Sequence, residues 1–356
     1  MKAGSKIVLG GIAGGTLLAG AAAAVGAALA GRRVLNQIRN RRGDDLHGQT
    51  ALITGGSRGL GLALAEEFAR QGCRIMLCAR DEQELMRARQ ELEYRGTEVS
   101  AIACDVSRQQ DVERMIGAAR ERFGHVDILV NNAGIISVGP LLSQTLEDFR
   151  QAMDVMFWGT VYPTLAVIPE MIKRRSGRII NVTSIGGKVS IPHLLPYGCA
   201  KFATVGFSEG LHAELKRYGI HVLTVAPGLM RTGSHLNAVF KGKHEQEYGW
   251  FALSGTNPMF SIAVDRAARQ IVNAARKKQA ELIISWQAEL LALAHGVAPG
   301  LTARALSLVN QLLPDAEGTS QEAKTGRQSQ SAVTRSPLTA LGRRAARRYN
   351  QLEKPA

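Results

Sequence analysis

The feature that most constrains this chain is a glycine-rich loop between an apolar run and a helical segment. Thr54-Gly-Gly-Ser-Arg-Gly-Leu-Gly61 follows the apolar run 50–54, and a stretch of helical period, 62–70, begins where the loop ends. Glycines let a backbone turn sharply and approach a pyrophosphate, whose charge is met by amide groups at the positive end of the helix. The order of strand, loop and helix favours a dinucleotide site over an ordinary glycine-rich turn.

Short apolar runs alternate with longer helical stretches from residue 50 to about residue 285, which is typical of a parallel sheet covered on both faces. The predicted strands are 50–54, 74–78, 98–104, 127–131, 178–183, 221–226 and 282–285. They predict a doubly wound α/β fold of the Rossmann type, with a mostly parallel seven-stranded sheet and helices on both faces. Thr145 to Asp148 indicates a capping box, and Gly72 indicates the end of the first helix.

Further motifs follow in order, at the ends of predicted strands or on a predicted helix. They are Asp105-Val106, Asn131-Asn132-Ala133-Gly134, Ser184, Tyr197-Gly198-Cys199-Ala200-Lys201, and Pro227-Gly228 with Thr232. Together with the Thr-Gly-x-x-x-Gly-x-Gly spacing, this set resembles the short-chain dehydrogenase/reductase family over residues 50 to about 285. The resemblance implies an oxidoreductase that passes hydride between a nicotinamide and a ketone or alcohol.

The resemblance also implies which residues contact the cofactor and which take part in the reaction. The implied cofactor residues are Gly55, Ser57, Arg58, Gly59, Leu60, Gly61, Arg80, Asp105, Val106, Asn132, Ala133, Gly134, Tyr197, Lys201, Pro227, Gly228 and Thr232. Tyr197 would pass a proton to or from the substrate oxygen, Lys201 would hold the nicotinamide ribose, and Ser184 would polarise the carbonyl. Tyr197 and Lys201 are four residues apart and so share one helix face, where the ammonium can stabilise a phenolate.

The charge at the end of the second strand favours NADP(H) over NAD(H). Relatives that select NAD carry an acidic side chain at this place to bind the ribose, whereas this chain has Ala79 followed by Arg80. Arg58 lies in the glycine loop, so two guanidinium groups are expected to flank a 2′-phosphate. Asp81 is expected to cap the next helix rather than bind the ribose.

One position departs from the family pattern. Where relatives usually carry an asparagine that anchors a water in the proton relay, this chain has Met156, within Val155-Met-Phe-Trp-Gly159. A thioether is a weak acceptor and cannot donate a hydrogen bond. An enzyme remains the favoured interpretation; the alternative is a catalytically weak NADPH-binding protein that acts as a membrane-associated scaffold or sensor.

The net charge of +14 is concentrated at the two ends of the chain, so it does not by itself favour nucleic acid. The uncharged run Ile7–Ala30 is long enough to span a bilayer and is followed by an arginine cluster. These features favour a membrane anchor with the catalytic domain facing the cytoplasm. A cleaved signal peptide, suggested by Ala28-Leu-Ala30, and a soluble leader are the alternatives.

The predicted organisation is an N-terminal hydrophobic segment with its basic flank (1–46), a catalytic domain (47–289), a helical extension (290–313), and a flexible linker with a basic tail (314–356). The tail is interpreted either as a basic helix on anionic lipid or as a solvated segment. A homo-oligomer is expected. No pair of histidines or cysteines has metal-ligand spacing, so no metal is predicted, and the four cysteines are expected to be reduced thiols.

The stretch 229–260 is expected to form a lid over the nicotinamide, and residues 233–260 within it lack clear periodicity. Its apolar side chains are Leu236, Val239, Phe240, Trp250, Phe251, Leu253, Met259 and Phe260. They are interpreted either as the lining for an apolar or lipid-like substrate or as residues that pack the lid onto the domain.

Overall fold

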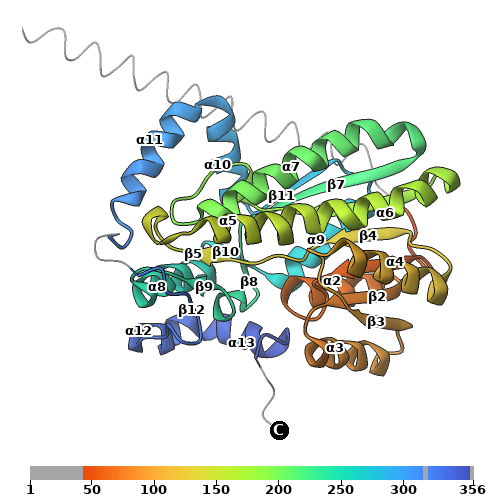
Figure 1. Ribbon diagram of the computed structural model, residues 1–356, viewed down its shortest axis with the longest axis horizontal. Helices are drawn as coiled ribbons and strands as arrows, with labels where there is room; N and C mark the ends of the chain where they lie inside the picture. Colours follow the sequence, from red (N-terminus) through yellow and green to blue (C-terminus); the bar gives the residue numbers. More distant parts are fainter. Residues whose placement is uncertain (1–42, 316–319, 353–356) are drawn as a thin grey trace, which may run out of the picture. The chain divides into compact units, whose positions relative to one another are not determined.

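A seven-stranded parallel sheet forms the centre of the described chain (Figure 1). The computed structural model describes residues 43–315 and 320–352, so the predicted span Ile7–Ala30 lies outside it. The strands are β1 (Thr50–Thr54), β2 (Arg74–Ala79), β3 (Val99–Ala103), β4 (Ile128–Asn131), β6 (Gly177–Val182), β7 (Ile220–Pro227) and β11 (Glu281–Ile284). Their order is β11-β7-β6-β4-β1-β2-β3, with every pairing parallel, which confirms the predicted fold class.

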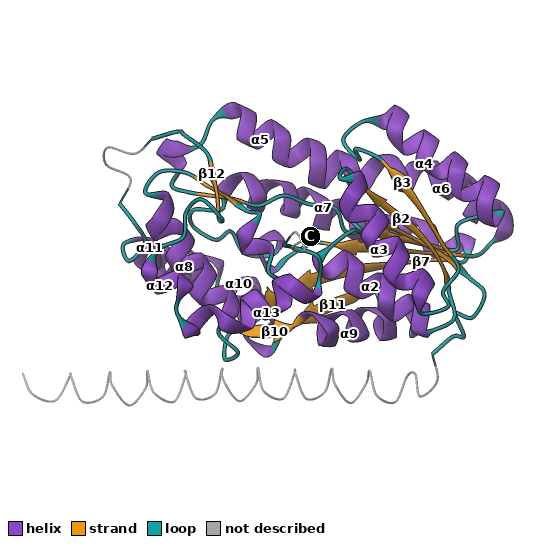
Figure 2. Cartoon of the chain, turned by 90° about the horizontal axis from the view of Figure 1, so that it is seen from below, coloured by secondary structure: helices purple, strands orange, loops and turns teal. Residues whose placement is uncertain are grey.

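Helices cover both faces of this sheet, as the edge-on view in Figure 2 shows. One layer contains α2 (Gly59–Arg70), α3 (Glu82–Tyr94) and α9 (Val264–Arg276), and the other contains α4 (Gln109–Phe123), α6 (Gly159–Arg174) and α7 (Leu195–Leu215). Successive side chains of a strand point to opposite faces. In β1, Ala51 and Ile53 therefore enter the first core while Leu52 enters the second. Burial on both faces explains why the three central residues of this strand are all apolar.

Local sequence signals fixed the element ends closely. Each observed strand end lies within one residue of its predicted position. Thr145 and Asp148 form the predicted capping box at the start of α5 (Leu146–Ala152). Gly72 follows the end of α2 with a φ of +77°, a conformation that glycine adopts without strain. The first helix begins at Gly59, three residues earlier than predicted, because the glycine loop itself supplies its first turn.

One long apolar helical run lies inside the domain. From α5 the chain continues through a π-helical turn, η2 (Met153–Trp158), into α6. Within the described residues, Leu146–Arg174 is the run that is long and apolar enough to cross a membrane by length and composition. Half of its most apolar window is buried, and α6 packs on α4 and β4. We therefore interpret it as a core helix of the domain.

The lid contains regular structure that its pattern did not reveal. It includes β8 (Leu229–Arg231), β9 (Val239–Phe240) and α8 (His244–Thr256); β10 (Ser261–Ala263) pairs with β8, and β5 (Ser137–Val138) pairs with β9. On α8, Tyr248 and Ala252 are buried while Trp250 and Phe251 are half-buried. Because apolar side chains occur around much of this helix rather than along one stripe, the sequence shows no helical period there.

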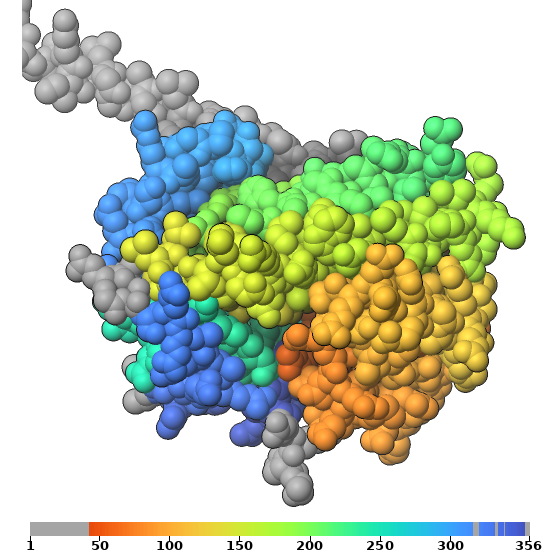
Figure 3. Space-filling view, in the orientation of Figure 1, coloured from red at the N-terminus to blue at the C-terminus, as the bar shows by residue number. Residues whose placement is uncertain are grey.

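The C-terminal part differs from the expected flexible linker and free tail in residues 320–352. After α10 (Trp286–Val297) and α11 (Pro299–Asn310), the chain forms β12 (Lys324–Thr325), which pairs with β9. It continues through α12 (Ala332–Arg335) and the 3₁₀ turn η6 (Pro337–Thr339) into α13 (Ala340–Arg348). In Figure 3 this segment, in dark blue, packs against the rest of the domain.

Hydrogen bonds from short polar side chains stabilise the turns of this segment. The hydroxyl of Ser329 donates to the carbonyl of Thr325 over 2.9 Å, and that of Thr339 donates to the carbonyl of Thr334 over 2.6 Å. Ser329, Thr334 and Thr339 are all buried. A polar composition indicates solvation only while such groups stay in water. Here they bond to the backbone of their own turns, so the composition was misleading.

Candidate active site

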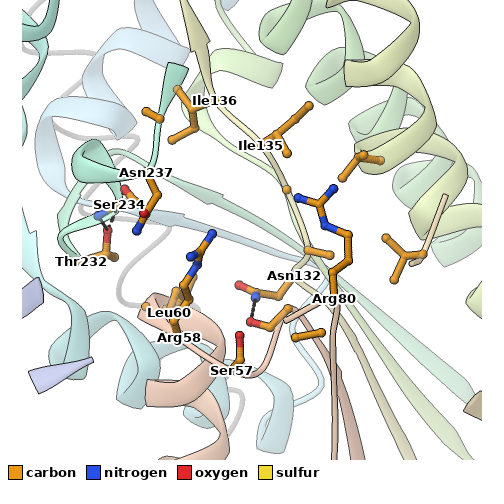
Figure 4. A pocket seen from close by; sticks show the side chains of 18 of the residues that line it. Ser57, Arg58, Leu60, Arg80, Asn132, Ile135, Ile136, Thr232, Ser234 and Asn237 are labelled. Carbon is orange, nitrogen blue, oxygen red and sulfur yellow. Dashed lines mark hydrogen bonds between the residues drawn. The ribbon is translucent and has the colours of Figure 1, made fainter. Parts of the chain in front are cut away.

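A cavity of about 850 Å³ opens at the carboxyl ends of the central strands (Figure 4). It lies where the sheet order reverses between β1 and β4, which is where doubly wound folds bind their ligands. Most of the predicted cofactor residues line it: Gly55, Ser57, Arg58, Gly59, Leu60, Arg80, Asp105, Val106, Asn132, Ala133, Gly134, Tyr197, Lys201 and Thr232. The structure thus brings together Arg80 and residues from five of the predicted motifs, whereas Ser184 is not among the lining residues.

Hydrogen bonds between the ends of β1 and β4 set the base of the cavity. The hydroxyl oxygen of Thr54 accepts from the amides of Asn132 (3.0 Å) and Ala133 (3.1 Å). The side-chain amide of Asn132 donates to the carbonyls of Thr54 and Gly55. These contacts tie the glycine loop to the end of β4, so both walls of the cavity are positioned by the sheet.

The loop needs glycine at defined positions. Gly55 and Gly59 have φ values of +63° and +58°, which side chains rarely allow. A Cβ on Gly61 would lie 2.0 Å from the carbonyl oxygen of Gly55, so this residue packs beneath the loop and does not line the cavity. No side chain caps the start of α2 and no acidic residue lies in its first turn. The positive end of this helix is therefore suited to an anion.

Two other predicted cofactor residues, Pro227 and Gly228, lie behind the cavity wall. Pro227 ends β7 opposite Ile284, and the amide of Gly228 donates to the Ile284 carbonyl. A Cβ on Gly228 would lie 2.7 Å from the Ser285 hydroxyl. These two residues fix the course of the chain toward Thr232, which does line the cavity, but they do not face the cavity themselves.

The two arginines predicted to select the cofactor both reach the cavity, but their partners differ. The guanidinium of Arg58 lies 2.8 Å from the carboxylate of Glu84. Arg80 is exposed and forms no hydrogen bond or ion pair with the residues that the structure describes. Asp81 caps α3 by accepting from the amide of Glu84, as predicted, so its carboxylate is already engaged. Arg80 is therefore the more available cation at this end of the cavity.

The end of β3 forms another part of the cavity. The carboxylate of Asp105 accepts from the amide and the hydroxyl of Ser107, which fixes its orientation. Val106 is buried, and a Cβ on Gly159 would lie 2.7 Å from it. An apolar side chain next to an oriented carboxylate is suited to a nucleobase.

The reactive side chains meet at the inner end of the cavity. Tyr197 and Lys201 lie on α7, with the Lys201 ammonium 5.8 Å from the centre of the Tyr197 ring. The Ser184 hydroxyl, just after β6, accepts from the amide of Gly186 over 3.0 Å. It lies beside Tyr197, since a Cβ on Gly186 would lie 3.3 Å from the Tyr197 ring and 3.4 Å from the Ser184 hydroxyl oxygen. The ammonium of Lys201 donates to the Val182 carbonyl over 2.9 Å. The sequence motifs at 184 and 197–201 are thus one spatial cluster.

Burial dominates the acid–base properties of this cluster. It raises the pKa of Tyr197 above its usual value, an effect that the Ser184 hydrogen bond partly offsets. Burial also lowers the pKa of Lys201 to about 8. We expected Lys201 to stabilise the phenolate, but Ser184 is the group that lowers the phenol pKa in the protein alone. The Tyr197 phenol is therefore protonated at neutral pH.

Met156 occupies a buried position in the π-helical turn η2. A Cβ on Gly134 would lie 3.6 Å from the Met156 sulfur and 3.9 Å from the Lys201 ammonium, so thioether and ammonium are neighbours. The Met156 carbonyl accepts from the hydroxyls of Thr160 (2.8 Å) and Thr204 (3.2 Å). This carbonyl therefore already accepts two hydrogen bonds, and the Met156 thioether, a weak acceptor, cannot donate as an asparagine amide would.

Sequence reasoning missed several cavity residues. The Lys241 ammonium and the Asp148 carboxylate form an ion pair of 2.6 Å at the outer end, and Gln351 lines the cavity from the C-terminal segment. No periodicity or motif marked Lys241 or Gln351, and Asp148 was predicted only as part of a capping box, because the three residues come from distant parts of the chain. Of the eight apolar lid residues named from the sequence, Val239 lines the cavity, as do Met230 and Ala238 of the same stretch, whereas Leu236 and Phe240 pack inside the lid. The packing interpretation therefore holds for Leu236, Phe240, Trp250 and Phe251, whereas Met259 and Phe260 are exposed.

Comparisons with known proteins agree with this geometry. Residues 49–240 match the family model for short chain dehydrogenases. The chain belongs to the short-chain dehydrogenase/reductase family. It is 33% identical over 251 residues to dehydrogenase/reductase SDR family member 7B of Xenopus laevis, covering 69% of this chain and 76% of that protein. It is 39% identical over 188 residues to the oxidoreductase UcpA of Salmonella typhimurium, covering 52% and 71% of the two chains.

Solved structures of this family share the fold. An actinorhodin polyketide ketoreductase variant crystallised with NADPH has a TM-score of 0.60 and 30% identity, covering 67% of this chain and 95% of its own. L-sorbose reductase from Gluconobacter frateurii, in complex with NADPH and L-sorbose, has a TM-score of 0.61 and 27% identity, covering 68% and 97%. This short-chain dehydrogenase/reductase is accordingly an oxidoreductase that acts between an alcohol and a carbonyl and uses a nicotinamide cofactor.

Proposed function

We propose that this family member is an NADPH-dependent reductase of an apolar carbonyl compound. The observation that carries the proposal is the half-buried Tyr197 phenol, which lies beside Ser184 and faces the inner end of the dinucleotide cavity. Because burial keeps the phenol protonated at neutral pH, it is ready to donate a proton to a carbonyl oxygen.

The nicotinamide would supply the hydride, and the chain's own residues would carry out the rest. Ser184 polarises the carbonyl and orients the Tyr197 hydroxyl. Tyr197 donates the proton to the oxygen, and Lys201 binds the nicotinamide ribose with its ammonium. Ser184, which lowers the phenol pKa, also favours the phenolate that is left after donation.

Selection of NADPH is assigned to Arg80 and Arg58. Both side chains line the cavity beside the glycine loop, and the second strand ends in Ala79 rather than in an acidic residue. A 2′-phosphate there would accept charge-assisted hydrogen bonds from Arg80. Arg58 would contribute less, because its guanidinium is already paired with the Glu84 carboxylate.

The outer end of the cavity supports an apolar substrate. Ile135, Ile136, Met230 and Val239 line it. The ion pair of Lys241 with Asp148 neutralises both charges, so this end does not favour an anionic or cationic substrate. We assign to this part of the cavity a lipid-like or other long-chain ketone.

A panel of ketones tests this assignment. NADPH oxidation is followed with the purified protein across a series of methyl ketones of rising chain length. We expect kcat/KM to rise with chain length, since each added methylene buried is worth about 0.8 kcal/mol. A preference for short, polar ketones would contradict the substrate assignment while leaving the reductase assignment intact.

We also propose that the chain attaches to a membrane, on the basis of the uncharged run Ile7–Ala30. Self-association is proposed because apolar side chains of α10 and α11, such as Trp286 and Leu301, are exposed. We infer that the catalytic domain faces the cytoplasm. Fractionation of cells that express the full chain or a variant lacking residues 2–42 tests the anchor. Equal recovery of both from the soluble fraction would contradict it.

A further inference from the structure

The last residues of the described chain contact the glycine loop directly. After α13, the carbonyl of Tyr349 accepts from the amide of Gly59 over 2.9 Å. The side-chain amide of Asn350 donates to the carbonyls of Ser57 and Glu84, each over 3.0 Å. Figure 1 shows α13 beside the start of α2. These residues lie far beyond the part of the chain that matches the family model, which ends at residue 240.

Tyr349 to Gln351 is a fixed part of the domain. Tyr349 is 2% exposed and belongs to the core that includes α2 and α9. The backbone carbonyl of Gln351 accepts from Arg327 over 2.8 Å and from the side chain of Asn237 over 3.2 Å. The segment therefore bridges the glycine loop on one side and the lid on the other.

The side chain of Gln351 presents a free donor to the cavity. Its amide oxygen accepts from the side chain of Asn237 over 2.6 Å, which directs the amide nitrogen, Nε2, the other way. A Cβ on Gly59 would lie 2.7 Å from this nitrogen and 3.9 Å from the Cβ of Thr232. Gln351 is 4% exposed and lines the cavity, yet Nε2 makes no hydrogen bond within residues 43–315 and 320–352.

We propose that Gln351 is a cofactor-binding residue that donates a hydrogen bond to the pyrophosphate, and that residues 349–351 form a clamp over the bound dinucleotide. The proposal rests on the proposed function. An amide donor without a partner among the described residues, carried by a buried side chain between the glycine loop and Thr232 and facing the cavity, has the chemistry that a pyrophosphate oxygen requires. The cavity keeps a volume of about 850 Å³ with Gln351 as part of its wall, so the segment encloses the site rather than filling it.

The test compares Gln351→Ala and Gln351→Glu with a matched control, Gln321→Ala, which changes an exposed glutamine of the same C-terminal segment. Kd and the dissociation rate of NADPH are measured by nicotinamide fluorescence. Loss of a hydrogen bond to a charged group predicts a Kd raised about tenfold to a hundredfold in Gln351→Ala, with faster release. Gln351→Glu keeps the shape but repels the pyrophosphate, so we expect a larger effect. The control should bind like the wild type.

Adenosine 2′-monophosphate shows whether the effect is local, because it lacks the pyrophosphate. We expect it to bind the wild type and Gln351→Ala equally, which also shows that the variant is folded. An unchanged or lowered Kd for NADPH in Gln351→Ala would overturn the proposal, and so would an equal loss of 2′-monophosphate binding. If the chain instead selects NADH, the proposed NADPH dependence fails. The Gln351 proposal would still require Gln351→Ala to raise the Kd for NADH, because both dinucleotides contain the pyrophosphate.

Discussion

Replacing Arg80 with aspartate should reverse the cofactor preference. Arg80 lines the cavity at the end of β2, is exposed, and has no partner among the described residues that the substitution would strand. The change therefore acts on the bound 2′-phosphate rather than on the fold. Arg58 cannot fully replace it, because Glu84 holds its guanidinium at 2.8 Å.

The size of the effect follows from two contributions. Loss of a hydrogen bond between charged groups costs about 1.5–3 kcal/mol. The new carboxylate adds a repulsion of about 1–4 kcal/mol with a phosphate about 4 Å away, depending on the local dielectric. The carboxylate can also accept hydrogen bonds from the ribose hydroxyls of NADH. Together these contributions predict a shift of about a hundredfold or more in the ratio of the two affinities.

Fluorescence titration of NADPH and NADH, each with wild type and Arg80→Asp, measures that ratio. The matched control is Arg89→Asp, which changes the charge equally on α3 but outside the cavity lining. Salt should weaken NADPH binding to the wild type more than to Arg80→Asp. An NADPH-to-NADH ratio that stays the same in Arg80→Asp, or that moves equally in the control, would refute the assignment of the 2′-phosphate site.

Two further predictions concern the catalytic cluster. Met156→Asn places an amide next to Lys201. We expect kcat for the best ketone of the panel to rise about tenfold, with little change in KM. An unchanged kcat would show that the proton relay does not need an asparagine at this position. The pKa of Lys201 in the folded protein is about 8, below its usual value of 10.5. Between these two pH values the unfolded state binds more protons than the folded state. The free energy of unfolding of the cofactor-free protein should therefore rise with pH in this range. Urea unfolding at pH 7.5 and pH 9.5 measures this rise, and a rise of the same size in Lys201→Met would assign it to another group.

The sheet and the catalytic cluster could be predicted from sequence because their signals are local. A buried parallel strand is apolar throughout, the glycine loop needs its glycines for backbone reasons, and Tyr197 and Lys201 share a helix face by their spacing alone. The α/β order then brings the strand ends together without further information.

The rest depends on contacts between distant residues. The bond from Gly59 to Tyr349 joins two ends of the domain, and no pattern near either residue indicates it. The pairing of Arg58 with Glu84 likewise depends on how α3 packs beside the loop. Residues 320–352 were expected to be flexible because their polar groups were assumed to be solvated, whereas several are buried and bonded to the backbone.

The most direct test of the central claim compares turnover and cofactor binding in Tyr197→Phe. The substitution removes only the phenolic hydroxyl that Ser184 orients, so the fold and the dinucleotide cavity should persist. We predict that ketone-dependent oxidation of NADPH falls by about a hundredfold or more, the range typical for a general acid, while the Kd for NADPH changes by less than about threefold. Turnover by Tyr197→Phe at the wild-type rate would contradict the account.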